Sequence, residues 1–221
     1  MVRKLNEDAF VECPETALWA VADGMGGHNN GDFASALIIQ RLARISPAET
    51  VYALRGEVAR QLGQANEELQ ASGRSPMGAT VAALTACRGY YSCTWAGDSR
   101  VYLLRKGRLR RLTSDHSVVQ TLVDAGEISA EEARHHSHAH IVTRAVGANP
   151  DLALETANGE LEAGDRFLLC SDGLTSVVDD LQILELINGS DISSANDGLI
   201  SRTLENGAPD NVTAVLVDVL S

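Results

Sequence analysis

The stretch at residues 21–30, VADGMGGHNN, places the carboxylate of Asp23 at the end of an apolar run and directly before a glycine-rich turn. Such turns often bind phosphates or dinucleotides, but no Lys-Ser or Lys-Thr pair follows, and position 29 is Asn where a dinucleotide fingerprint needs Gly. Oxygen ligands in this setting suit Mg²⁺ or Mn²⁺ instead. The glycines would let backbone carbonyls approach such a cation.

Similar carboxylates recur where apolar strands are expected to leave or enter the core: Asp23, Asp98, Asp172 and Asp210. Glu7 and Asp8 open the first expected strand. A single Asp-Gly pair is more often a turn than a metal ligand. Several carboxylates gathered at one sheet edge would repel one another, and divalent cations supply the counter-charge that such a group needs. The recurrence therefore favours a metal site over isolated turns.

Strands and helices must position these acids, and apolar periodicity with turn signals predicts both kinds of element. Strands are expected at 7–13, 17–23, 78–87, 90–98, 100–107, 108–113, 152–159, 165–173 and 211–220. Helices are expected at 33–45 and 51–70, as two short helices within 116–135 broken at Gly126, and as two helices within roughly 174–206. Strands joined by very short turns must be antiparallel. The pattern favours an α+β fold of antiparallel sheets covered by helices, with a doubly wound parallel sheet as the weaker alternative.

Composition narrows the functional classes. The chain has 221 residues, of which 44% are apolar, and a formal net charge of −12, which argues against nucleic acid as a partner. The basic stretch 105–112 reads as a hairpin with exposed basic faces. No apolar run could span a bilayer, and no signal segment opens the chain. The cysteines lack C-x-x-C spacing and have apolar neighbours, so we expect buried free thiols in a reducing cytoplasm: Cys13, Cys87, Cys93 and Cys170.

Eight stretches carry a family resemblance: RKLNEDAF, VADGMGGHNNGDFAS, MGATVAAL, WAGDSRVYLLRKG, LTSDHSVVQTLVDAGEISAEEA, IVTRAVG, FLLCSDGLTSVV and PDNVTAVLV. In this order, over nearly the whole chain, the sequence resembles the bacterial metal-dependent type 2C serine/threonine protein phosphatases. The resemblance implies one catalytic domain over 1–221, with a flap beside the site at about 113–147. It also implies a four-layer α-β-β-α sandwich of two antiparallel sheets flanked by helix pairs.

The resemblance further implies two tightly bound Mn²⁺ or Mg²⁺ ions, bridged by Asp23 at one edge of the sandwich. Gly24 would offer its backbone carbonyl to one ion, while Asp172 and Asp210 would bind the other. Two metals lower the pKa of a shared water, which then attacks phosphorus. They also offset the charge of about −1.5 to −2 on a phosphoserine. The implied activity is hydrolysis of phosphoserine and phosphothreonine in proteins without a covalent intermediate.

Other acids have supporting roles by the same resemblance. Glu7 and Asp8 would act mainly through metal-bound waters. Asp98 matches the aspartate that, together with Asp172, holds a weaker third ion in bacterial relatives. Asn211 directly follows the last of the metal-binding aspartates and would orient its loop.

Two basic residues complete the implied site. Arg3 occupies the family position that grips the phosphate, because a guanidinium fork matches two phosphate oxygens at once. Its alternative reading is a solvated terminal charge, and relatives usually carry about one more strand before this arginine. His28 follows the glycines and would protonate the leaving serine. A loop histidine that caps a turn is an equally weighted alternative for His28.

The flap departs from the family pattern. Relatives often show His-Pro and then Arg-Asn before the TRA motif, whereas this chain reads HHSHAHIVTRA. If the segment is extended, His136, His138 and His140 fall on one side, where imidazoles could bind zinc or nickel. The favoured alternative is a solvated flap whose histidines, His135 included, pair with acids.

The implied partners are phosphorylated proteins and a cognate bacterial serine/threonine kinase, and the protein is expected to be a cytoplasmic monomer without nucleic-acid or membrane partners. Two other classes of function remain open. One is a catalytically silent regulatory module of the same fold, against which the intact set of acids argues. The other is a metal-dependent hydrolase of small phosphoesters, which the relative turnover of a phosphopeptide and an aryl phosphate would distinguish.

Overall fold

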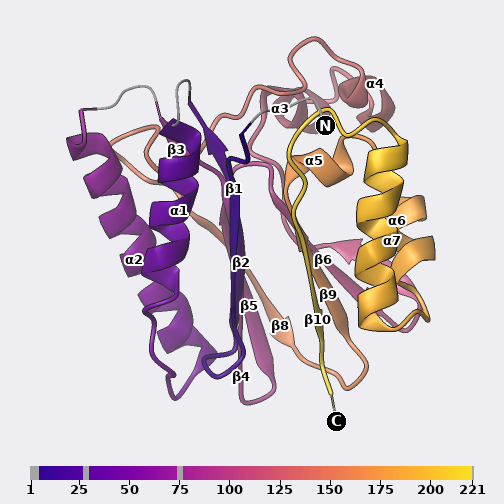
Figure 1. The fold of residues 1–221 in the computed structure, drawn as a ribbon, viewed down its shortest axis with the longest axis horizontal. Coiled ribbons are helices and arrows are strands. Elements are labelled where there is room, and N and C mark those ends of the chain that lie inside the picture. Colours follow the sequence, from indigo (N-terminus) through magenta and orange to yellow (C-terminus); the bar gives the residue numbers. More distant parts are fainter. Residues whose placement is uncertain (1–4, 27–29, 74–76, 221) are drawn as a thin grey trace.

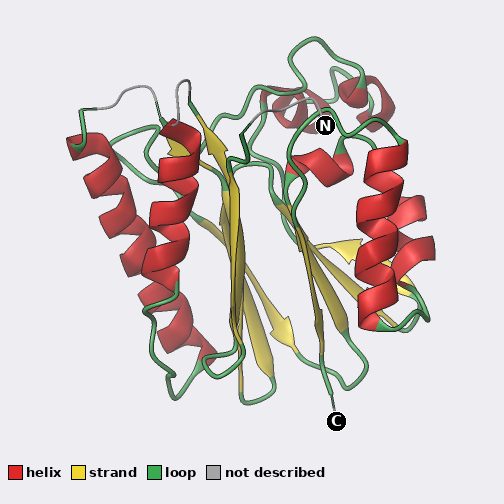
Figure 2. Ribbon diagram, in the orientation of Figure 1, coloured by secondary structure: helices red, strands yellow, loops and turns green. Residues whose placement is uncertain are grey.

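The computed structural model describes residues 5–26, 30–73 and 77–220. Two antiparallel sheets lie face to face, and a pair of helices covers the outer face of each (Figures 1 and 2). This confirms the α-β-β-α sandwich and excludes the doubly wound parallel alternative.

The first sheet has the strand order β1-β2-β4-β5-β8, with β3 paired to β2. Its strands are β1 (Asp8–Cys13), β2 (Leu18–Met25), β3 (Gly78–Ala79), β4 (Val81–Cys87), β5 (Tyr90–Ala96) and β8 (Glu155–Glu160). Two long helices, α1 (Asn30–Leu42) and α2 (Val51–Ala71), pack on its outer face through a continuous apolar cluster. Thr50 caps α2 by accepting a hydrogen bond from the backbone of Ala53, which fixes where this helix begins.

The second sheet has the strand order β10-β9-β6-β7. Its strands are β6 (Arg100–Arg105), β7 (Arg108–Arg111), β9 (Arg166–Cys170) and β10 (Ala214–Asp218). Helices α6 (Asp180–Ile187) and α7 (Ile192–Glu205) cover it, and the one-turn helix α5 (Asp172–Thr175) follows β9 directly. The basic stretch 105–112 is the expected hairpin between β6 and β7.

Strand β9 shows why the sequence produces a sandwich. Phe167 and Leu169 point into the core between the two sheets, whereas Leu168 and Cys170 point into the core beneath the helices. Side chains alternate along a strand, so a strand covered on both faces must be apolar at successive positions. The apolar run ends at Cys170, and the polar residues that follow it, Ser171 and Asp172, lie beyond the sheet.

Two short helices, α3 (Val118–Asp124) and α4 (Ala130–Arg134), form the flap (residues 113–147) near α5 at one end of the sandwich (Figure 1). Ser117 caps α3, and Ser129 forms a capping box with Glu132 at the start of α4. Gly126 lies between them with a φ of +71°, a conformation that glycine adopts without a steric penalty. The break expected at this glycine is therefore confirmed.

The histidine segment of the flap is not extended, so the condition for the zinc hypothesis is not met. Backbone hydrogen bonds from His136 to Ala133 and from Ala139 to His136 make a series of turns. The rings of His136 and His138 meet edge to face, with centroids 5.3 Å apart. Among the described residues, no group of three or more His, Cys, Asp or Glu side chains could hold a metal ion as placed.

Other boundaries also needed correction. The strand expected over 165–173 ends at Cys170, because a backbone bond from Ser176 to Asp172 starts α5 there. The strand expected from 152 begins at Glu155. All the cysteines are free, but Cys13 and Cys87 are only half-buried, contrary to the expectation of burial. None of the helices in the described ranges is both long and apolar enough to cross a bilayer.

Candidate metal centre and adjoining pocket

Strand pairing places two of the predicted acids side by side. Asp8 and Asp23 are direct partners in the antiparallel pair of β1 and β2. Like charges in this position destabilise a sheet. The backbone around Asp23 is nevertheless held firmly, since Thr80 donates its N–H to the Asp23 carbonyl at 2.9 Å and accepts the Asp23 N–H at 3.3 Å. The fold thus enforces an unfavourable pairing of carboxylates.

The second sheet brings further acids to the same place. Asp172 follows β9, and its neighbour Gly173 lies so close to the 211 loop that an added Cβ would be 1.8 Å from the carbonyl oxygen of Asn211. Asn211 donates its backbone N–H to the Asp210 carboxylate at 2.8 Å, and its side chain accepts the backbone N–H of Glu7 at 3.0 Å. Asn211 therefore links the loop before β10 to the start of β1.

Asp8 is also oriented from the second sheet. Its Oδ2 accepts hydrogen bonds from the hydroxyls of Ser171 and Thr213, each at 2.8 Å. The Ser171 hydroxyl in turn accepts the backbone N–H of Thr213 at 3.0 Å. These bonds join β1 to the ends of β9 and β10, so the acid cluster lies where the two sheets meet.

The pKa values of these acids reflect their burial and their closeness to one another. Burial raises the pKa of Asp23 well above its ordinary value, and the charges of Asp172, Asp8 and Asp98 raise it further. The direct interaction between the two carboxyl groups of Asp23 and Asp172 raises the pKa of Asp23 further and partly offsets the rise that burial causes in the pKa of Asp172.

The other acids are perturbed in the same direction. Burial, followed by the charge of Asp172, raises the pKa of Asp98 to about 7. Burial also raises the pKa of Asp8, and the charges of Asp172 and Asp210 add to this effect. In the described part of the chain, no ion pair joins Asp8, Asp23, Asp98 or Asp172 to a basic side chain.

Such a donor set fits hard divalent cations. It consists of carboxylate oxygens with backbone carbonyls nearby, and it lacks the sulfur ligands that favour softer metals. Gly24 packs closely against α1 and against the backbone of Glu7. An added Cβ at this position would be 2.1 Å from the Gly31 oxygen, so a side chain has no room there. As placed, the described acids form no closed ligand group. Their mutual repulsion opposes closure until a cation offsets it.

The structure thus brings together most of the acids that the sequence singled out, namely Asp8, Asp23, Asp98, Asp172 and Asp210, with Glu7 and Gly24 beside them. Arg3 and His28 lie outside the described residues. Sequence reasoning assigned no role to Arg100 and Asp115, although both fall within the motifs WAGDSR and LTSDHS.

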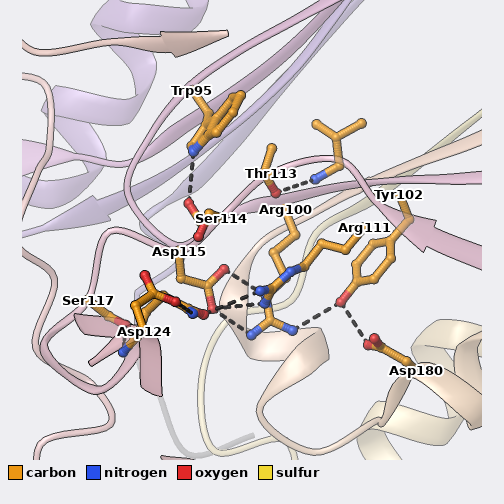
Figure 3. Close-up of polar contacts among 12 residues, drawn as sticks. Trp95, Arg100, Tyr102, Arg111, Thr113, Ser114, Asp115, Ser117, Asp124 and Asp180 are labelled. Carbon is orange, nitrogen blue, oxygen red and sulfur yellow. Dashed lines mark hydrogen bonds and ion pairs between the residues drawn. The ribbon is translucent and has the colours of Figure 1, made fainter. Parts of the chain in front are cut away.

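Arg100 and Asp115 form an ion pair beside the cluster (Figure 3). The Arg100 guanidinium binds both Asp115 oxygens, at 2.9 and 2.6 Å, and donates to the Tyr102 hydroxyl at 3.0 Å. Tyr102 donates in turn to Asp180 at 2.9 Å. This chain of bonds ties β6 to the start of the flap and to α6.

His116 holds the base of the flap against the first sheet. Its Nδ1 accepts the backbone N–H of Gly97 at 3.0 Å, and its Nε2 lies 3.2 Å from Glu155. Because Nδ1 accepts a hydrogen bond, the neutral ring carries its proton on Nε2. Burial, followed by the charge of Arg144, lowers the pKa of His116.

A pocket of about 410 Å³ opens next to the acid cluster. Asp98 and Asp172 line it on the side of the cluster, and the flap helices line it on the other, with Arg100 and Asp115 also in its wall. The candidate metal centre and this pocket are therefore continuous.

Comparisons with known proteins were made for the whole chain. A family model described as "Protein phosphatase 2C" matches residues 3–221. The serine/threonine protein phosphatase PstP of Mycobacterium tuberculosis is 38% identical over 228 residues, covering 100% of this chain but 43% of that protein. The serine/threonine phosphatase stp of Listeria monocytogenes is 34% identical, covering 98% of this chain and 91% of that protein.

Solved structures agree. One described as PppA, a key regulatory component of T6SS in Pseudomonas aeruginosa, is 44% identical, with a TM-score of 0.90 over 99% of this chain and 93% of that one. The catalytic domain of PstP in complex with two manganese ions is 37% identical, with a TM-score of 0.89 over 100% of this chain and 94% of that one.

Proposed function

The chain belongs to the protein phosphatase 2C family, and we propose that it hydrolyses phosphoserine and phosphothreonine in proteins with Mn²⁺ or Mg²⁺ as cofactor. The observation that supports this most is the cluster of Asp8, Asp23, Asp98 and Asp172, whose pKa values burial and mutual repulsion raise. Repulsion between carboxylates held this close destabilises the fold, and a bound cation would offset their charge.

The positions of the acids support the following proposed roles. Asp23, Asp172 and Asp210, with the carbonyl of Gly24, are proposed to hold two ions. When bound, such ions would supply a water of lowered pKa and offset the charge of the phosphoryl group. Asp23 and Asp172 would have to be deprotonated to serve as ligands, so binding of the ions would be coupled to the release of any proton that their raised pKa values retain.

Asp8 and Glu7 are proposed to act through water. Ser171 and Thr213 occupy one oxygen of Asp8, so the carboxylate is fixed in orientation and its other oxygen is directed elsewhere. Asp98 is proposed to hold a weaker third ion together with Asp172, which matches its place between the cluster and the pocket. This third site would be the easiest to lose, since burial and neighbouring acids keep Asp98 protonated up to a pH of about 7.

Arg3 and His28 keep the roles that the family resemblance implies. Arg3 would bind two phosphate oxygens through its guanidinium fork. His28 would give a proton to the leaving serine, a step that matters most when the leaving alcohol is a poor one. Replacing His28 with Ala should therefore slow phosphoserine hydrolysis more than hydrolysis of an activated aryl phosphate.

Residues 1–221 are proposed to form one catalytic domain that acts as a monomer on phosphorylated proteins, opposing a serine/threonine kinase in the cytoplasm, with neither membrane nor nucleic acid as partner. The excess of acidic residues agrees with the last point, because nucleic-acid binding needs clustered basic side chains.

The deciding experiment measures hydrolysis of a phosphothreonine peptide and of p-nitrophenyl phosphate, each with Mn²⁺, with Mg²⁺ and with a chelator. We expect both substrates to be hydrolysed only when a metal is present. Turnover of the aryl phosphate alone would favour a hydrolase of small phosphoesters. Absence of turnover with both metals, despite a metal-induced rise in Tm, would favour a silent binding module.

A further inference from the structure

The flap wall of the pocket beside the acid cluster combines polar side chains with an apolar stripe that α3 and α4 provide. We propose that this pocket is a subsite for a large apolar side chain of the substrate protein, close in sequence to the phosphorylated residue. The proposal rests on the proposed phosphatase function and adds to it a class of preferred substrate.

The flap helices provide the first evidence. Neither α3 nor α4 buries any of its residues. Val119 and Val123 of α3 are four residues apart, and Ala130 and Ala133 of α4 are three apart, so each pair lies on one face of its helix. All four line the pocket. Each helix thus turns an apolar face to a space that no other part of the described chain fills.

Charge provides the second evidence, because it argues against an anionic ligand such as a second phosphate. The Arg100 guanidinium is already bound to both oxygens of Asp115 and to the Tyr102 hydroxyl. Arg111 is likewise engaged, donating to Gln120 at 3.2 Å. Asp98, Asp115, Asp172 and Asp180 also line the pocket. An anion would meet these four carboxylates, and among the guanidinium groups of this wall only that of Arg134, the last residue of α4, has no partner within the described residues.

Continuity with the acid cluster identifies the occupant. Asp98 and Asp172 belong to the cluster and also line the pocket. A protein whose phosphorylated residue reaches the cluster must therefore lead its neighbouring chain past the pocket. Extended chain advances about 3.3 Å per residue, so the side chain that enters belongs to a residue roughly one to three positions away. A volume of about 410 Å³ can hold a leucine or phenylalanine side chain.

The test uses phosphothreonine peptides in which Leu or Phe replaces Ala at each position from three before to three after the phosphothreonine. For the unmodified protein with Mn²⁺, we expect about a tenfold higher kcat/KM with the apolar residue at one position, from the burial of its side chain. The measured quantity is the ratio of kcat/KM for the apolar and Ala peptides, taken within each variant, so changes in basal turnover cancel.

Two variants locate the preference. Ala133→Phe fills the pocket from α4, and its ratio should fall to about one. Val119→Asp places a carboxylate in the pocket at the second position of α3, where negative charge favours the helix. Its preference should change from apolar residues to Lys or Arg. Ala125→Phe is the matched control, because Ala125 is exposed on the same flap and does not line the pocket. Its ratio should stay near tenfold.

The outcomes separate the two proposals. A ratio near one at every position for the unmodified protein overturns the subsite, and so does a tenfold ratio that survives in both Ala133→Phe and Val119→Asp. Thermal midpoints show whether each variant folds. If only one of the two variants folds, a tenfold ratio that survives in that variant overturns the subsite. If p-nitrophenyl phosphate is hydrolysed but no phosphopeptide is, the phosphatase proposal itself fails, and the subsite fails with it for a distinguishable reason.

Discussion

Strand β9 separates two groups of acids whose surroundings are opposite. Beyond its last residue, Asp172 meets Asp8, Asp23 and Asp98, and burial, together with the charges of neighbouring carboxyl groups, raises their pKa values. No basic residue of the described chain forms an ion pair with any of them. The other end of the strand, near the C-terminus of the chain, has a different arrangement (Figure 1).

At that other end, arginines pair with the acids. Arg105 binds both oxygens of Asp165, at 2.7 and 2.6 Å, and Asp165 is only 1% exposed. Arg166, the first residue of β9, binds both oxygens of Asp218 at 2.6 and 2.8 Å. Its guanidinium also donates to the carbonyl of Ile187 at 2.8 Å, which ties the sheet to α6.

The difference shows how to separate acids that stabilise the fold from acids that serve a ligand. Bidentate arginine pairs satisfy a buried carboxylate within the chain itself. Where the chain provides no such partner, the folded state carries an unfavourable charge that only a bound cation can offset. The same substitution, Asp to Asn, should therefore have opposite consequences at the two ends of β9.

The largest effect is expected at the unpaired end. Asp23→Asn and Asp172→Asn should each lower metal-dependent turnover by about a thousandfold or more, since each removes a charged ligand of the proposed ions. Neither should lower the Tm of the metal-free protein, because each also relieves repulsion between carboxylates. Kinetics with Mn²⁺ and thermal unfolding with a chelator would check both points. Turnover near the unmodified rate in either variant would remove the basis for the two-ion site.

Asp165→Asn is the matched substitution at the paired end. It leaves Arg105 with its other partner, Glu162, but without a bidentate carboxylate. We expect a loss of about 2–3 kcal/mol in the free energy of unfolding, somewhat less than for a fully buried pair because Arg105 is partly exposed. Turnover per folded molecule should be unchanged. Urea unfolding and kinetics below the transition would measure the two quantities, and a loss of turnover without a loss of stability would break the comparison.

The sequence pointed to the acids of the unpaired end, whose role as metal ligands stays a prediction, but it did not point to the ion pairs of the other end, for a physical reason. Acids at strand ends recur in a local pattern, so Asp23, Asp98 and Asp172 could be recognised without knowing their neighbours. The partners Arg105 and Asp165 are 60 residues apart, and only the pairing of β6 with β9 brings them together. Nothing local distinguishes such an arginine from a solvated one.

The flap shows the same limit. Its two helices were predictable because Ser117, Ser129 and Gly126 are local signals for where helices begin and end. The sequence left open whether the histidine segment is extended, because the turns after α4 are set by backbone bonds that the sequence does not reveal. The ion pair of Arg100 with Asp115 was likewise missed, although both residues lie in recognisable motifs.

Asp98 sharpens the comparison because it lies at the margin of the unpaired group. Asp98→Asn should lower turnover by about tenfold, since it removes a ligand of only the weaker third ion proposed here. Calorimetry with Mn²⁺ should still detect two tight sites. If those two sites disappear in this variant, Asp98 belongs to the same ligand set as Asp23, and the distinction between tight and weak sites is wrong.

The smallest effect concerns His116, a titratable residue whose Nδ1 accepts the Gly97 N–H and whose Nε2 faces a carboxylate. Its Nε2 faces Glu155, while the cation of Arg144 lies nearby and Asp115 is its sequence neighbour. Burial and Arg144 lower its pKa below the ordinary value of 6.5, so the folded state binds a proton less readily than the unfolded state. Its contribution to stability is therefore fully present above about pH 6.5 and decreases as the pH falls toward the folded pKa.

His116→Asn tests this contribution, because the Asn side-chain oxygen can still accept the Gly97 N–H but does not titrate. Between pH 7 and pH 5, the free energy of unfolding should fall less steeply in the variant than in the unmodified protein. The difference in slope cannot exceed about 1.4 kcal/mol per pH unit for one proton. Chemical unfolding at several pH values in the presence of chelator measures it, and since both proteins keep the acid cluster intact, its titration contributes equally to both slopes. Identical slopes would mean that Glu155 compensates for burial and that His116, like the paired acids at the other end of β9, is fully satisfied within the fold.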